Sequence, residues 1–176
     1  MHSKFIDLMR GNRDHHQKKV TLFSHLVGVP LITLGVLILF GWIKVSIPGI
    51  FTLSAAWIGI IIFAIYYLIM DLLIGAVTTA ILIVFCAITS ALTINGPSAL
   101  SEKLFIVIFI LGLIFQLIGY LFEGKKPLLL KNFFSSVSIA PFLVTAEILF
   151  MLGLKEDLQK QVLKVHEEEN SDKTQL

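Results

Sequence analysis

The sequence has one cysteine and few charged residues. A single thiol, Cys86, cannot form an intramolecular disulfide or a thiolate metal cluster, and its apolar surroundings in the sequence predict a small buried residue. Charged residues make up 15% of the 176 residues, against roughly 25% in soluble domains. The formal net charge is only +2, and the basic residues are scattered rather than clustered. We therefore expect no nucleic-acid partner.

The first 21 residues lack the apolar segment and the small-residue cleavage site of a secretory signal. We therefore expect the N-terminus to stay in the cytosol. The chain is instead rich in apolar residues, which account for 56% of the sequence and give a mean hydropathy of +0.89. This composition predicts a polytopic membrane protein.

Five apolar segments approach the length of about 20 residues that crosses a ~30 Å hydrocarbon core. Since lipid offers no water to open backbone groups, we expect each segment to be a helix. The predicted fold is an all-α, polytopic membrane helical bundle of about five transmembrane helices, preceded by an N-terminal interfacial segment. The predicted spans are Leu26 to Ile43, Phe51 to Met70, Leu72 to Leu92, Leu104 to Phe122 and Val137 to Gly153.

Breaks between these spans have distinct signals. We expect a tight turn at Met70 to Gly75, with Asp71 at its apex, and loops at the Pro- and Gly-containing segments 44–49 and 94–103. Pro141 predicts a kink or a partly interfacial course in the last span. Residues 1–154 are expected to form one membrane domain, and residues 155–176 an amphipathic tail that becomes polar and disordered.

Lysine and arginine are more frequent in the segments that an inward N-terminus places in the cytosol. Five spans then put the tail outside, while a four-span arrangement with the tail inside stays open. We expect the inner membrane if the source is bacterial and the endoplasmic reticulum membrane if it is eukaryotic. This topology gathers five potential ligands at the cytosolic face, namely His16, His25, Asp71, Tyr120 and Glu123.

Several polar residues require partners inside the bundle. Gln116, Tyr120 and Glu123 are spaced i, i+4, i+7, so they share one helical face, which we expect to point inward. Glu147 falls near the middle of the last span, where an ionised carboxylate costs at least ~2.5 kcal/mol. We expect Glu147 to be protonated, paired or exposed to a polar cavity.

The two histidines nearest the first span are nine residues apart. At ~100° per residue, His16 and His25 lie on opposite sides of one straight helix. They can share a metal only if the helix breaks between them, for which residues 17–20 are the favoured place. His15 is an alternative to His16. All three histidines can instead be interfacial side chains that face lipid headgroups.

Glu123 lies in the last turn of the predicted fourth span, where an acid opposes the helix dipole and needs a basic or metal partner. The lysines that follow have an ordinary explanation. Gly124 suits a helix C-cap, and Lys125 and Lys126 complement the dipole and the positive-inside bias.

Three segments resemble one family. The first combines His16, His25 and "LVGVPLI" after them; the second is "QLIGYLFEGKKP" from Gln116 to Pro127; the third, weaker one is "KNFFSSVSIAPFLVTAEILFMLG". Together they resemble the Mpo-type family of membrane-embedded, iron-dependent 2-hydroxy fatty acid dioxygenases, over about residues 5–154. Tyr120 stands where the family has a histidine, and Lys18 and Thr21 stand near positions where it has asparagines.

The resemblance implies Fe(II) as cofactor, and O₂ and a 2-hydroxy fatty acid as substrates, with shortening of the acyl chain by one carbon. It implies His16, His25 and Glu123 as metal ligands and Tyr120 and Glu123 as catalytic residues. Lys125 and Lys126 then meet the substrate's head group. A tyrosine ligand favours Fe(III) over the Fe(II) of the family and would alter the reactivity of the site. The alternative is therefore a non-catalytic lipid-binding or structural membrane protein that has lost a metal ligand but retains the fold. A small transporter is a third, weaker alternative.

Overall fold

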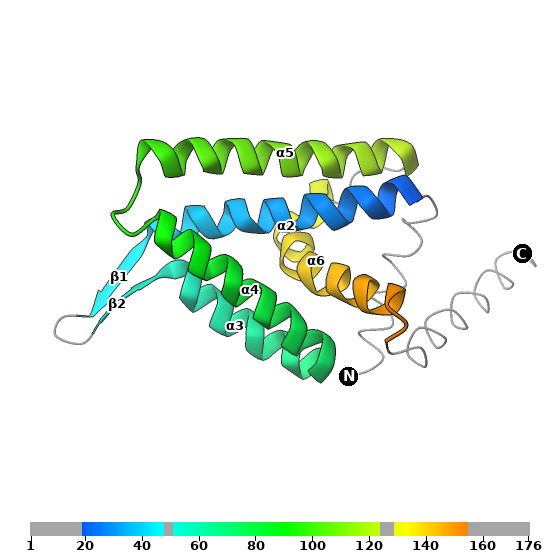
Figure 1. Cartoon of the computed structure of the whole chain (residues 1–176), viewed down its shortest axis with the longest axis horizontal. Helices are drawn as coiled ribbons and strands as arrows, with labels where there is room; N and C mark the ends of the chain where they lie inside the picture. The colour runs from blue at the N-terminus through cyan, green and yellow to red at the C-terminus, as the bar shows by residue number, and fades with distance from the viewer. Residues whose placement is uncertain (1–18, 48–50, 124–128, 155–176) are drawn as a thin grey trace, which may run out of the picture.

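The computed structural model describes residues 19–47, 51–123 and 129–154 (Figure 1). Within these residues the fold is helical apart from one short hairpin, which confirms the predicted all-α class. The elements are α2 (Lys19–Trp42), β1 (Lys44–Ile47), β2 (Phe51–Ser54), α3 (Ala55–Met70), α4 (Leu72–Leu92), α5 (Ala99–Glu123) and α6 (Leu129–Met151). Each predicted span corresponds to one of these helices.

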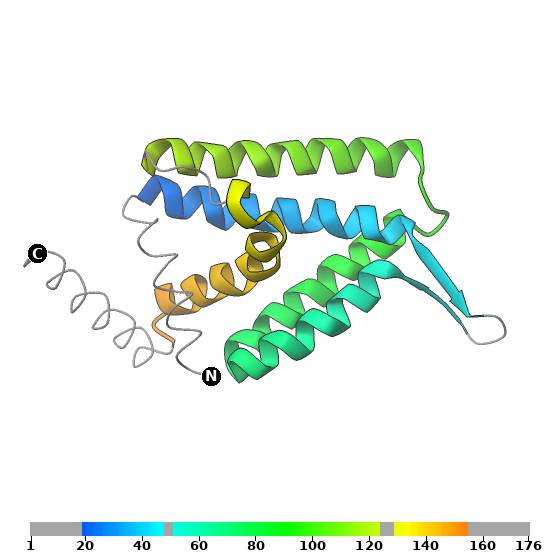
Figure 2. The ribbon, with the colours of Figure 1, turned by 180° about the vertical axis from the view of Figure 1, so that it is seen from behind.

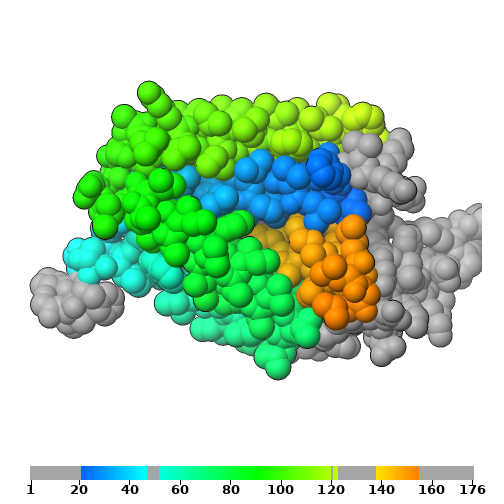
Figure 3. All heavy atoms as spheres, viewed as in Figure 1, coloured from blue at the N-terminus to red at the C-terminus, as the bar shows by residue number. Residues whose placement is uncertain are grey.

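Two antiparallel helix pairs form the frame of the bundle. Helix α2 runs alongside α5, and α3 alongside α4 (Figures 1 and 2). The pairs meet near the β-hairpin and diverge toward the opposite end, where α6 lies between them and packs against both α2 and α4. Figure 3 shows the atoms of α6 between those of α2 and α4 on one face of the molecule. The end opposite the hairpin therefore collects the start of α2, the end of α5 and the last turns of α6.

Glycines let α2 and α5 approach closely. A Cβ added to Gly28 would lie 2.9 Å from Cγ of Gln116, and one added to Gly112 would lie 2.8 Å from Cγ1 of Ile32. Between helices in an apolar environment, small residues of this kind allow close van der Waals packing of the two backbones. Contacts between glycine backbone on one helix and side chains on the other therefore hold α2 and α5 together.

Asp71 alone separates α3 from α4, which confirms the predicted turn and its apex. Its backbone N–H donates to the carbonyl oxygen of Tyr67 at 3.1 Å, and Oδ1 accepts from the N–H groups of Leu73 and Ile74, each at 3.0 Å. Gly75 allows α4 to fold back closely on α3, since a Cβ there would lie 2.4 Å from the carbonyl oxygen of Tyr67. Asp71 therefore acts as the N-cap of α4.

Helix α6 changes direction along its length, as the kink predicted at Pro141 requires (Figure 2). Proline lacks an N–H, and its ring disturbs the turn before it, so backbone carbonyls there need other donors. The hydroxyl of the buried Tyr67 donates to the carbonyl oxygen of Ser138, three residues before Pro141. The ring of Tyr67 stacks on Phe142 at 5.4 Å between ring centroids, and thus Tyr67 fastens α3 to the bend of α6.

One expectation from the sequence requires correction. Residues 44–47 and 51–54 form an antiparallel hairpin, so α3 begins at Ala55 rather than at Phe51. Among the described residues, three helices are long and apolar enough to cross a membrane, within Thr21–Trp42, Leu72–Leu92 and Ala99–Gly119. Helix α3 has 16 residues, a rise of about 24 Å, and the apolar part of α6, Ser138–Met151, is also shorter than a full span. The tail, residues 155–176, lies outside the described residues, so the side of the membrane on which it lies stays a prediction.

Candidate functional site

The site begins with His25, in the second turn of α2. Its imidazole is 9% exposed and faces α5, where Cδ2 lies 3.6 Å from the position that a Cβ on Gly119 would occupy. Two neighbours on α2 make the same contact. Ser24 Cβ lies 3.3 Å from that position, and Thr21 Oγ1 donates to the carbonyl oxygen of Gly119 at 3.4 Å. A Cβ at residue 119 would therefore touch His25 at ordinary van der Waals distance and lie slightly too close to Ser24, so Gly119 lets this turn of α2 pack closely on α5.

On the α5 side of the site lie the three residues predicted to share an inward-facing helical face, Gln116, Tyr120 and Glu123. Gln116 is 5% exposed and packs on Gly28 of α2, which confirms its inward position. Tyr120 directly follows Gly119 in α5, and Glu123 is the last residue of that helix. Their side chains lie outside the described residues, so their inward orientation stays a prediction.

The contact between His25 and Gly119 joins two segments that the sequence analysis singled out separately. One is the segment from His16 to Ile32 and the other runs from Gln116 to Pro127. The antiparallel course of α2 and α5 is the reason, because it sets the first turns of one helix against the last turns of the other. The α2–α5 pair therefore carries the predicted metal-binding segments at one end of the bundle.

Several predicted site residues fall outside the described structure. These are His16, Lys125 and Lys126, together with the side chains of Tyr120 and Glu123. Residues 19 and 20 of the interval predicted for a break between His16 and His25 are helical, and residues 17 and 18 lie outside the described residues. Across the described ranges, no cluster of three or more His, Cys, Asp or Glu residues could hold a metal ion.

Two other acidic residues have different environments. Asp71 bonds the first amides of α4, so its carboxylate serves the α3–α4 turn. Glu147 is 8% exposed within α6, so it is buried in the described structure, and its predicted protonation or pairing stays a prediction. Glu147 lies on the helix that packs against both α2 and α4, between the two helix pairs.

The chemistry of His25 fits a metal site. Imidazole nitrogen is a common ligand of iron, and a ligand held between close-packed helices keeps its orientation. His25 meets these conditions through its burial and its contact with α5. Of the three metal ligands that the family resemblance implies, His16, His25 and Glu123, it is the one whose side chain the structure describes.

Sequence reasoning missed Thr21, Ser24 and Gly119. A signal was present in the spacing, since Thr21, Gly28 and Gly35 follow one another at intervals of seven, as do Gly112 and Gly119. Such repeats of small residues indicate a helix face that packs closely on another helix.

Comparison with known proteins identifies the family. The profile described as 2-hydroxy-palmitic acid dioxygenase Mpo1-like matches residues 3–152. The chain belongs to the Mpo1-like family. This Mpo1-like chain is also 29% identical over 100 residues to the 2-hydroxy-palmitic acid dioxygenase MPO1 of Saccharomyces cerevisiae. The aligned region is 56% of this chain and 55% of the yeast protein, so it spans about half the length of that relative. No solved structure matches this Mpo1-like chain.

Proposed function

We propose that this protein is a membrane-embedded, Fe(II)-dependent dioxygenase that acts on 2-hydroxy fatty acids, with its N-terminus in the cytosol. The observation that carries the proposal is the contact of His25 with Gly119. It brings a potential imidazole ligand against the helix that ends in Tyr120 and Glu123. The name of the yeast relative supports the substrate class.

His16, His25 and Glu123 would hold the iron, as two imidazoles and one carboxylate. A shell of this type leaves coordination positions open, and Fe(II) there supplies the one-electron chemistry that O₂ needs to react with a closed-shell substrate. The protein itself would position the ligand side chains and exclude water from the metal site. Close packing of α2 on α5 fixes His25 relative to the last turn of α5, and the buried Gln116 packs on Gly28 across the same helix interface.

The substrate has an apolar acyl tail and a charged carboxylate, and the protein has apolar helices and, next to them, a pair of lysines. The acyl tail would lie along the apolar helices, while Lys125 and Lys126, just beyond α5, would receive the carboxylate. Cleavage of the C1–C2 bond with O₂ as the oxidant would shorten the acid by one carbon, with C1 released as CO₂ and with water as the second by-product. Tyr120 would contact substrate or O₂ through its hydroxyl, or would take the place of a histidine ligand.

A second function is favoured by one feature, the tyrosine at position 120 where the family has histidine. With one neutral ligand fewer, the same fold would serve as a non-catalytic lipid-binding or structural membrane protein. The fold is unaffected by this choice, because Tyr120 lies at the end of α5, beyond the glycine contacts that hold α2 and α5 together.

Metal analysis and oxygen uptake separate the two functions. The full chain, purified in detergent under anaerobic conditions with Fe(II), should retain close to one iron per chain and consume O₂ with 2-hydroxypalmitate. Palmitate, which lacks the hydroxyl group, is the matched control and should give no uptake. His25→Ala should lose iron, whereas His2→Ala should keep it. Absence of both iron and substrate-dependent uptake would favour the lipid-binding function.

A further inference from the structure

The β-hairpin that follows α2 has two chemically different faces. Its register pairs Lys44 with Ser54, Val45 with Leu53, and Ser46 with Thr52. Residues directly opposite each other in an antiparallel pair share a face, and successive residues alternate between faces. Polar residues therefore occupy one face, where the hydroxyl oxygens of Ser46 and Thr52 lie 3.1 Å apart. Val45 and Leu53 occupy the other.

The hairpin extends beyond the helices and turns away from the direction of α2 (Figures 1 and 2). It joins the bundle at its base, where β2 contacts α2 and α3. Val45 is 42% exposed and Leu53 is partly exposed, so the rest of the described chain leaves the apolar face partly uncovered. An isolated two-stranded hairpin is marginally stable in water, so this one needs an apolar surface against it.

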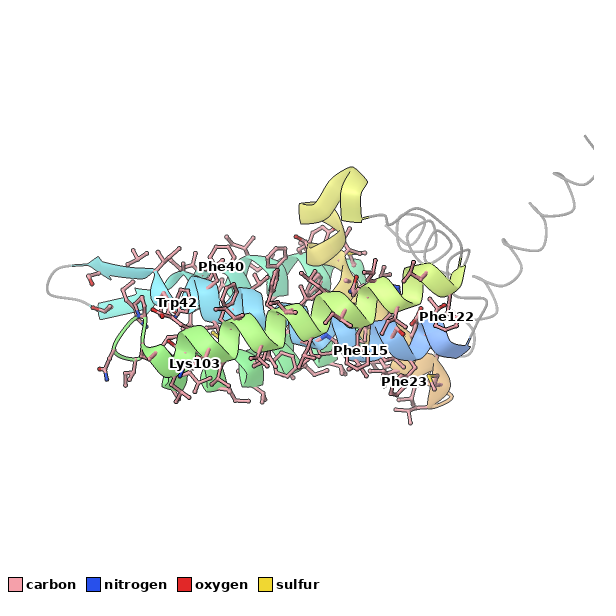
Figure 4. The ribbon with its side chains drawn as sticks, turned by 90° about the horizontal axis from the view of Figure 1, so that it is seen from above. Phe23, Phe40, Trp42, Lys103, Phe115 and Phe122 are labelled. Carbon is pink, nitrogen blue, oxygen red and sulfur yellow. The ribbon has the colours of Figure 1, made fainter. Side chains whose placement is uncertain are left out.

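Its surroundings indicate which surface that is. Trp42 ends α2 and Trp57 lies in the first turn of α3, on either side of the hairpin, and their indole N–H groups donate to Ser101 and Ser90. Figure 4 shows Trp42 and Lys103 together at this end of the bundle. Tryptophan gathers where the hydrocarbon core meets the headgroups, and lysine reaches toward those headgroups. The hairpin thus leaves the bundle at the level of a membrane interface.

We propose that the hairpin is an in-plane membrane anchor that lies in the phospholipid interface. Val45 and Leu53 face the acyl chains, and Ser46 and Thr52 face the headgroups and water. The anchor sets the depth of the bundle at the end opposite His25. This inference rests on the membrane embedding in the proposed function, and it is independent of the iron site and of catalysis.

Spin labels at the four positions of two adjacent cross-strand pairs test the alternation of faces. The full chain with Cys86→Ala, so that no native thiol reacts, receives one cysteine at position 45, 46, 52 or 53 and a nitroxide label. Each protein is reconstituted in vesicles of phosphatidylcholine and phosphatidylglycerol. O₂ concentrates in lipid and a neutral nickel chelate stays in water. We expect the ratio of O₂ to nickel accessibility to be severalfold higher at positions 45 and 53 than at 46 and 52.

Two further labels calibrate the measurement. Ile114, 46% exposed on α5, should report lipid, and the exposed Asn95 should report water. A label at Ile114 that reports water overturns the membrane embedding and this proposal with it. If Ile114 reports lipid, equal nickel accessibility at all four hairpin positions overturns the anchor alone.

A second copy of the chain is the competing occupant of the apolar face. In that case labels at positions 45 and 53 would be reached by neither reagent. Their spectra would also show spin–spin broadening that disappears on dilution with unlabelled protein. Such a result overturns the anchor and assigns the face to an interface between copies.

Discussion

The imidazole Cδ2 of His25 lies 3.6 Å from the point where Gly119 would carry a Cβ, across the interface of α2 and α5. The two residues are distant in sequence and belong to separate signature segments. Their proximity sets the second turn of α2 against the last turns of α5, which is where the proposed metal site would lie. It also makes Gly119 a position where added volume acts directly on the site.

Gly119→Val should therefore disturb the site. Its Cβ would already lie 3.3 Å from Cβ of Ser24, and two further methyl groups would crowd this close helix contact, so we expect a loss of about 1–3 kcal/mol in unfolding free energy. Iron retention should fall with it. Gly59→Val is the control, because a Cβ there meets nothing within 4 Å. Denaturation in mixed micelles and metal analysis measure both effects, and equal results for the two variants would contradict the packing described.

Tyr120→His tests whether the site is an impaired dioxygenase centre. The variant restores the histidine of the family pattern, and we expect iron affinity or oxygen uptake to rise by about tenfold or more, the scale on which changes around a metal ligand act. Tyr66→His, on an exposed position of α3, is the matched control for a new histidine. Unchanged iron content and uptake in Tyr120→His would count against a ligand position at residue 120.

Asp71 should matter for the α3–α4 turn and not for the metal. Asp71→Ala removes the acceptor of the Leu73 and Ile74 amides and should cost about 0.5–2 kcal/mol in unfolding free energy. Asp71→Asn keeps a side-chain oxygen, so its stability should stay close to that of the parent. Both variants should keep their iron. Loss of iron from Asp71→Asn would instead reveal a ligand role.

Tyr67→Phe should loosen the bend of α6. The variant keeps the ring that stacks on Phe142 and removes the hydroxyl that donates to the Ser138 carbonyl. A buried acceptor left without this donor should cost about 1–3 kcal/mol. Amide hydrogen exchange in α6 should accelerate around Pro141, while Tyr66→Phe, at an exposed neighbouring position, should leave it unchanged. Equal exchange in the two variants would show that Tyr67 does not hold the bend.

Local signals predicted the helices well because their causes are local. Long apolar runs predicted α2, α4 and α5, and Asp71 between two such runs predicted the turn that it caps. The hairpin was missed since segment 44–54 is short and contains Pro48 and Gly49, which favour a loop, while its alternation of polar and apolar residues covers only four positions per strand.

By itself, the sequence determined that this chain is a bundle of apolar helices with the signatures of the Mpo1-like family, because hydropathy and motif spacing depend on neighbouring residues alone. Only the tertiary structure decided that His25 packs on Gly119 and that Tyr67 supports the bend of α6. Such contacts join positions more than 70 residues apart in the sequence, as the separation of 71 positions from Tyr67 to Ser138 shows. They depend on which helix faces meet, and meeting faces are selected by close packing across the whole bundle rather than by any local pattern.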